Sequence, residues 1–121
     1  NLDKILDIAY KKGIVMSGVS AGAICWFDKG ITDSYLKKLE ILDCLGFIKG
    51  NACPHFDEES DREPFVRNII KNKIINSCIC IEGHNAFHIK NESNIKSVNF
   101  GNDKKCYELY SKGNRILKKV L

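Results

Sequence analysis

The chain has 121 residues, of which 44% are hydrophobic and 28% charged, and its formal net charge is +4. This size suits one compact domain, and this composition argues against intrinsic disorder. The positive charge comes from scattered lysines, with no basic block interleaved with aromatic residues, so we expect no nucleic-acid partner. No apolar run approaches the roughly 18 residues that a membrane-spanning helix needs, so we also expect no membrane partner.

The first third of the chain predicts short elements of both kinds. Residues 2–11 carry apolar side chains at close to helical spacing, and Gly13 is a suitable helix stop. The run at 14–18 predicts a short buried strand, and 21–27 has the small and apolar residues of a buried helix start. Residues 34–42 are ambiguous and predict a helical turn or two, with a short strand or turn at 46–50.

The rest of the chain predicts one helix followed by strands. A polar loop leads to a helix that begins near Ser60, where Glu63 completes a capping box and Pro64 occupies the first turn. From Ile74 the apolar residues alternate in short runs between turn residues, which predicts strands and hairpins. The order of elements predicts an α/β fold, a three-layer sandwich with antiparallel strands toward the C-terminus.

Six cysteines are present, and none forms a Cys-x-x-Cys pair. Disulfides would require a secretory context, and the sequence shows no signal peptide. We therefore predict that most of these cysteines are reduced and buried, and that the protein is cytoplasmic.

The segment Gly18–Gly22 reads Gly-Val-Ser-Ala-Gly between a predicted strand and a predicted helix. This pattern is typical of a nucleophile elbow, where a strained turn presents the serine and small neighbours leave room for the substrate. Ser20 would be the nucleophile, and the N–H of Ala21 could help to hold an oxyanion. A plain glycine-rich turn is an equal alternative from these five residues alone.

A catalytic serine needs a base, and the chain has three histidines. His55 lies in a polar loop, where site residues are often found. His84 lies beside a turn glycine, and His88 lies in a predicted strand. For each of them a structural role is a better interpretation than catalysis. They could share a metal ion, but no third ligand adjoins them at a sensible spacing, so we predict no metal.

Several carboxylates could orient the imidazole. Glu82 stands out because it ends an apolar run, and a carboxylate at the end of a buried strand costs free energy unless it is paired. Many such acids simply reach solvent, so the residues by themselves leave the choice open. The candidates are Asp33, Asp57, Glu58, Asp61 and Glu82.

Three segments together resemble the peptidase E family, serine peptidases of the S51 type related to cyanophycinase. They read GVSAGAICWF, CPHFDEESDRE and CICIEGHNAFHI, and the resemblance covers about residues 14–90. It implies a glutamine-amidotransferase-like (flavodoxin-like) fold, with Ser20 as nucleophile, His55 as base and Glu82 as acid. The order Ser, His, Glu differs from the order Ser, acid, His of α/β-hydrolases.

The resemblance also implies an activity. The family is known mainly for removing an N-terminal aspartyl residue from short peptides, through an acyl-enzyme and without a cofactor. Arg62 matches a family arginine that would meet the aspartyl carboxylate, and its alternative is an exposed arginine paired with Glu58 or Glu59. Asp33 matches a recurrent acid that would line the site or meet the substrate amine. The expected partner is a small peptide, and the sequence leaves a homodimer open.

The chain departs from the family pattern in one respect. Family members are longer, and their N-terminal half supplies the first strands and a Gly-Gly-Asn-type turn with a second oxyanion N–H. We therefore expect residues 1–121 to form a single but incomplete peptidase E-like domain. This leaves two alternatives open, namely a truncated inactive member that acts as an interaction module and a generic serine esterase.

Overall fold

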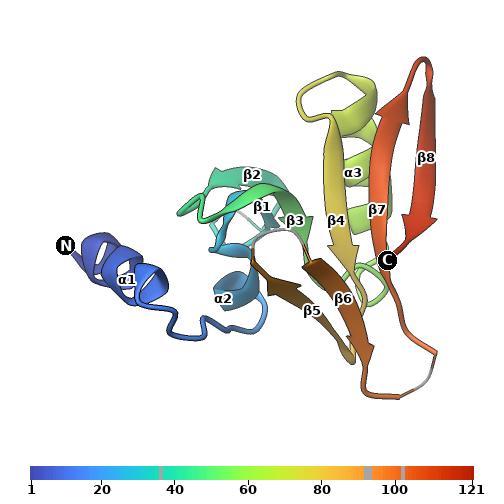
Figure 1. The fold of residues 1–121 in the computed structure, drawn as a ribbon. Helices are drawn as coiled ribbons and strands as arrows, with labels where there is room; N and C mark the ends of the chain where they lie inside the picture. The colour runs from blue at the N-terminus through green and yellow to red at the C-terminus, as the bar shows by residue number, and fades with distance from the viewer. Residues whose placement is uncertain (36, 92–93, 102) are drawn as a thin grey trace.

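The computed structural model describes residues 1–35, 37–91, 94–101 and 103–121 (Figure 1). Three helices and eight strands are formed in these ranges. In chain order they are α1 (Leu2–Lys11), α2 (Ala21–Ile24), β1 (Phe27–Thr32), β2 (Glu40–Asp43), β3 (Ile48–Cys53), α3 (Arg62–Lys71), β4 (Ser77–Ile81), β5 (Asn85–Lys90), β6 (Asn94–Asn99), β7 (Cys106–Lys112) and β8 (Arg115–Val120).

The main sheet is mixed and has the strand order β2-β1-β3-β4-β7-β8. The three central strands β1, β3 and β4 run parallel, whereas β2, β7 and β8 are antiparallel to their neighbours. Strands β5 and β6 form a separate antiparallel hairpin that projects below the main sheet in Figure 1. The prediction of an α/β fold with antiparallel strands toward the C-terminus is confirmed.

Apolar side chains pack on both faces of this sheet. On one face, α3 contributes Val66, Ile69 and Ile70 to a cluster that also contains the buried thiols of β4. On the other face, Ile24 of α2 packs with a smaller cluster that includes aromatic and aliphatic side chains of β5. Successive side chains of β4 point to opposite faces of the sheet. Cys78 and Cys80 therefore belong to the first cluster and Ile79 to the second.

The predicted helix at residues 2–11 is confirmed as α1, and Gly13 follows it with a φ of +77°. Tyr10 attaches this helix to the rest of the chain by stacking on Phe47, with 5.2 Å between the ring centroids. The helix also carries exposed apolar side chains, among them Leu2 and Ile5.

Two of the local predictions are wrong. Within the described residues, 14–18 form no strand, and Val15 is 89% exposed. An extended segment becomes a stable strand only beside a pairing partner, and the described ladders include none for this segment. Of the helical turns predicted at 34–42, residue 36 lies outside the described residues. Residues 40–43 form strand β2 instead, because they pair with β1 from Thr32↔Glu40 onward. Tertiary pairing here overrides the local pattern.

The predictions for the second half are confirmed more closely. Helix α3 includes Pro64 in its first turn, although its N-cap is Asp61 and the described contacts include no side-chain cap bond. The short strand or turn expected at 46–50 overlaps the start of β3, which continues to Cys53, and the alternating runs after Ile74 are strands β4 to β8. Residues 92–93 and 102, which belong to the turn residues expected between these strands, lie outside the described residues.

All six cysteines are free, and four of them are buried. Burial raises the pKa of the Cys53 thiol to about 12, because the charged thiolate is disfavoured in an apolar environment. Among the described helices, none is long and apolar enough to cross a bilayer.

Candidate active site

Three of the predicted site residues lie at one edge of the sheet. Asp33, His55 and Glu82 each follow the carboxyl end of a central strand, β1, β3 and β4 respectively. Because these strands are parallel neighbours, their carboxyl ends meet at the same edge. Ligand sites of open α/β sheets form at this edge.

Ser20 immediately precedes α2 and has φ 54° and ψ −119°. These angles lie outside the regions that residues with a Cβ ordinarily adopt, so the backbone at Ser20 is strained. Gly18 is needed beside it, because a Cβ there would overlap the carbonyl group of Gly22. A Cβ at Gly22 itself would meet no atom within 4 Å. The turn therefore has the strained serine of a nucleophile elbow, but the predicted strand at 14–18 does not precede it in the described residues.

His55 contacts Ser20 directly. Its Nε2 atom lies 2.8 Å from Ser20 Oγ, although the two residues are 35 positions apart. His55 also has a positive φ, 53°, and the N–H of the next residue, Phe56, donates a hydrogen bond to Ile81 O at 3.0 Å. This bond attaches the histidine loop to the end of β4.

The other ring nitrogen of His55 contacts Glu58. The Nδ1 atom lies 2.5 Å from Glu58 Oε2, and the Glu58 N–H donates to the carbonyl of His55 within the same turn. An ionised carboxylate can only accept, so Nδ1 is the donor to it, and in a neutral imidazole Nε2 is then the acceptor for the Ser20 hydroxyl. Serine, histidine and glutamate thus form a continuous hydrogen-bonded chain.

Glu82 has different partners. Its backbone N–H donates to Lys105 O at 3.2 Å, and its Oε2 accepts from the Lys105 N–H at 2.9 Å. The structure therefore brings Ser20 and His55 together but places Glu58, not Glu82, on the imidazole. Glu58 was one of several acids that the sequence left open, and its i,i+3 spacing from His55 is the signal that could have favoured it.

Arg62 and Asp33 also lie near each other. The Arg62 side chain is 2% exposed, and its donors reach Glu59 Oε2 at 2.7 Å, Ile31 O at 3.2 Å and Asp33 Oδ1 at 3.4 Å. The pairing with Glu59 agrees with the alternative considered from the sequence, but the arginine is buried instead of exposed. Asp33 itself remains half exposed.

Ala21 is the first residue of α2. The following N–H groups, those of Gly22 and Ala23, donate to Val19 O and Ser20 O. Of the residues that the structure describes, none accepts a hydrogen bond from the Ala21 N–H. This donor, directly after the serine, is free for another acceptor.

The chain matches the model of the family described as "Peptidase family S51" over residues 1–97. It belongs to this family. It is also 42% identical over 108 residues to a Bacillus subtilis (strain 168) protein named "Uncharacterized peptidase YgaJ". That alignment covers 89% of this chain and 46% of the relative, so the chain spans about half the length of the curated relative that it matches.

The region that matches family S51 contains Ser20, His55 and Glu58, together with the other two histidines. His84 and His88 are both exposed, and His88 lies opposite Lys96 in the β5–β6 hairpin. Among the described residues there is no group of three His, Cys, Asp or Glu side chains that could hold a metal ion.

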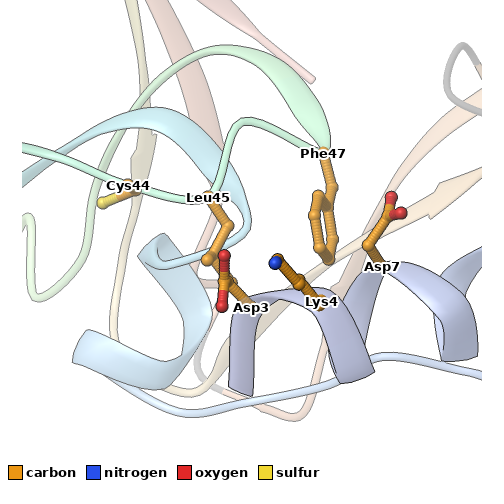
Figure 2. Close-up of a pocket in the computed structure, with 6 residues that line it drawn as sticks. All are labelled: Asp3, Lys4, Asp7, Cys44, Leu45 and Phe47. Carbon is orange, nitrogen blue, oxygen red and sulfur yellow. The ribbon is translucent and has the colours of Figure 1, made fainter. Parts of the chain in front are cut away.

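A pocket of about 410 Å³ lies elsewhere in this S51 chain, between α1 and the segment that joins β2 to β3 (Figure 2). Figure 2 shows the charged side chains of α1 on one side and Phe47 and Leu45 on the other. The predicted site residues are not among its lining residues, which are Asp3, Lys4, Asp7, Cys44, Leu45 and Phe47.

Proposed function

We propose that this chain provides the nucleophile and the general base of a serine peptidase that hydrolyses short peptides. One observation carries the proposal, namely the chain of contacts from Ser20 Oγ to His55 Nε2 at 2.8 Å and from His55 Nδ1 to Glu58 Oε2 at 2.5 Å. A serine activated by a histidine that a carboxylate orients is the arrangement used for acyl transfer. Membership of a peptidase family adds support.

The mechanism follows from these contacts. His55 Nε2 takes the Ser20 proton while Oγ attacks the scissile carbonyl carbon, and the Ala21 N–H donates to the oxygen that becomes negative. The imidazolium then gives its proton to the leaving amine as the C–N bond breaks. Water, deprotonated by the same Nε2, attacks the acyl-enzyme and releases the acid and the free serine.

The acid of the proposed triad is Glu58. Its carboxylate holds the Nδ1 proton and would stabilise the imidazolium that forms in each half-reaction. Glu82, which the family resemblance favours, would have to leave the Lys105 N–H to reach His55. Both assignments are testable by substitution, because each acid has a glutamine variant that preserves its size.

For the substrate, we propose a short peptide with an N-terminal aspartate. Arg62 would bind the aspartyl carboxylate, and Asp33, half exposed at the same sheet edge, would bind the α-amino group. Since Arg62 is buried, an incoming carboxylate would have to replace Asp33 on Nη2 at 3.4 Å, the longest of the three contacts of this guanidinium. An equal loss on Asp-led and Ala-led peptides in an Arg62→Ala variant would remove this role.

The function is tested with a fluorophosphonate, which reacts covalently with activated serines, and with Asp-p-nitroanilide as substrate. We expect one adduct on Ser20, and we expect Ser20→Ala and His55→Ala to abolish both labelling and turnover. Ser17→Ala is the matched control, because Ser17 is an exposed serine three positions away. Full turnover by Ser20→Ala, or equal labelling of Ser17, would contradict the proposal. Equal turnover of short acyl esters without an aspartyl preference would indicate an esterase.

A second candidate is an inactive family member that acts as an interaction module. The observation in its favour is the exposure of Ile14, Val15 and Val19, apolar side chains next to the serine. Such a protein would show no fluorophosphonate adduct, and its sedimentation coefficient would report self-association, including a homodimer. An adduct on Ser20 would reject the inactive alternative.

A further inference from the structure

The turn after β4 lies against the carboxylate of Glu58. A Cβ built on Gly83 would lie 2.6 Å from Glu58 Oε1 and 2.8 Å from its Cδ, closer than real Cβ atoms approach other heavy atoms. The backbone of Gly83 does not have the positive φ that favours glycine. Glycine is therefore required at position 83 because a side chain there would overlap the carboxylate of Glu58.

The turn cannot simply retreat, because Asp57 holds it in place. The Gly83 N–H donates to Asp57 Oδ1 at 2.7 Å, and the other oxygen of the same carboxylate pairs with Lys104. Partial burial would raise the pKa of Asp57, but the hydrogen bonds from Lys104 and from the Gly83 N–H outweigh it and lower that pKa. Asp57 is thus a charged acceptor at neutral pH, and it precedes Glu58 directly in the chain.

Glu58 itself is the mobile partner. Its side chain is 47% exposed, and the atoms that a Cβ at Gly83 would meet are the far end of this flexible side chain. A methyl group at position 83 would therefore be accommodated by rotation of Glu58 toward solvent. That rotation is inexpensive for the fold, but it removes Oε2 from the Nδ1 atom of His55.

We propose that Gly83 is a positioning residue that keeps the Glu58 carboxylate on His55, with Asp57 fixing the turn that carries it. This inference rests on the proposed function, since it describes how the base of that reaction is oriented. The Gly83 N–H donates to Asp57, and the space beside its Cα is filled by the Glu58 side chain, so its effect on the imidazole would pass through Glu58. A displacement of about 1 Å in such a contact can cost about 100-fold in rate.

The test is Gly83→Ala in the full chain, read by the ¹⁵N shifts of the His55 ring, which report which nitrogen carries the proton. In the parent protein we expect the Nδ1–H form, and in Gly83→Ala a shift toward the Nε2–H form with a melting temperature within about 3 °C of the parent. The value of kcat on Asp-p-nitroanilide should fall about 10- to 100-fold with little change in KM. Asp57→Ala should change the ring shifts in the same direction.

A double-mutant cycle separates this role from a general effect on the fold. In a Glu58→Gln background, Gly83→Ala should cause no further fall in kcat, because the residue acts through the Glu58 carboxylate. Unchanged ring shifts in Gly83→Ala would overturn the proposal, and so would an unfolded variant, since Gly83 would then be a residue of the fold. Ring shifts that respond in a protein without turnover would support the positioning role and contradict the proposed function alone.

Discussion

His55 Nε2 lies 2.8 Å from Ser20 Oγ, and both residues have a positive φ, 53° and 54°. Each such backbone costs on the order of 1–3 kcal/mol, so it persists only where surrounding contacts enforce it. At Ser20 the enforcing contact is the close approach of Gly18 to Gly22, and at His55 it is the bond from the Phe56 N–H to β4. Two strained residues from distant parts of the chain thus meet through their side chains.

The acid that orients His55 is tested by two matched substitutions. We expect Glu58→Gln to lower kcat on Asp-p-nitroanilide by about 10²- to 10⁴-fold, because an amide can present its N–H₂ group to Nδ1 and favour the wrong tautomer. Glu82→Gln should leave kcat nearly unchanged, since the amide oxygen can still accept from the Lys105 N–H. The reverse order of losses, with Glu82→Gln the more damaging, would restore Glu82 as the acid.

The two glycines of the nucleophile turn should respond differently to alanine. Gly18→Ala places a Cβ on the carbonyl of Gly22, a backbone group that cannot rotate away, and we expect a loss of about 2–4 kcal/mol in the free energy of unfolding. Gly22→Ala meets no atom within 4 Å and should be neutral or stabilising by up to about 1 kcal/mol. Urea unfolding of both variants measures the difference, and equal losses would contradict the explanation.

The sequence was most informative where one pattern spans an element. The helical spacing in α1 and α3 and the period of two after Ile74 depend on each element's own side chains, so they predicted those elements without the fold. The segment 14–18 carries the apolar composition of a strand, but a strand also needs a neighbour, and no ladder among the described residues provides one. The prediction for residues 40–43 was wrong for the converse reason. Their own pattern does not predict a strand, and they form β2 because they pair with β1.

The site shows a similar division. The contact between Ser20 and His55 agrees with the pairing that the family resemblance implied, which the short motifs alone had left open. The partner of Nδ1 could not be chosen, because it depends on side-chain directions: Glu82 turns to Lys105, while Glu58 folds back onto His55 in its own turn. The burial of Arg62 was equally unpredictable, since it depends on how the start of α3 packs against the end of β1.

Arg62 should contribute far more to stability than its helical neighbour Arg67. Removing Arg62 leaves Glu59 and Ile31 O without their buried donor, and we expect Arg62→Ala to cost about 2–4 kcal/mol, allowing for the partial exposure of its acidic partners. Arg67→Ala breaks only a partly exposed i,i+4 pair, whose acid Glu63 keeps Lys118, and should cost less than about 1 kcal/mol. Thermal unfolding of the two variants compares these losses. Similar decreases in melting temperature would show that the burial of Arg62 does not add to the stability of the fold.

The cysteines should react in two groups. Thiols react as thiolates, and burial both blocks access and, for Cys53, raises the pKa to about 12. We expect iodoacetamide at pH 8 to modify only the two partly exposed thiols, slowly, because desolvation also raises their pKa. Mass spectrometry should show at most two adducts in the native protein and six in urea. The partly exposed pair is Cys25 and Cys44, and the buried four are Cys53, Cys78, Cys80 and Cys106.

Acid should destabilise the fold through Asp57 and Glu63. Partial burial would raise the pKa of each carboxyl, but Lys104 at Asp57, and Arg67 and Lys118 at Glu63, outweigh it and lower both. A pKa that is lower in the folded state than in the unfolded state means that the contribution to stability is complete above the unfolded value. It is lost as the pH falls through the folded value, below the ordinary 3.8 for Asp and 4.5 for Glu.

The melting temperature should therefore stay level from pH 6.5 to about pH 5 and fall steeply below about pH 4.5. In the double variant Asp57→Asn, Glu63→Gln the two contributions are absent at every pH. This variant should melt lower than the parent at pH 6.5, and the difference between the two proteins should shrink toward pH 2.5, where the parent's carboxylates are protonated as well. A difference that stays constant over the whole range would show that the two carboxylates act through packing, because only a charge-dependent contribution disappears on protonation.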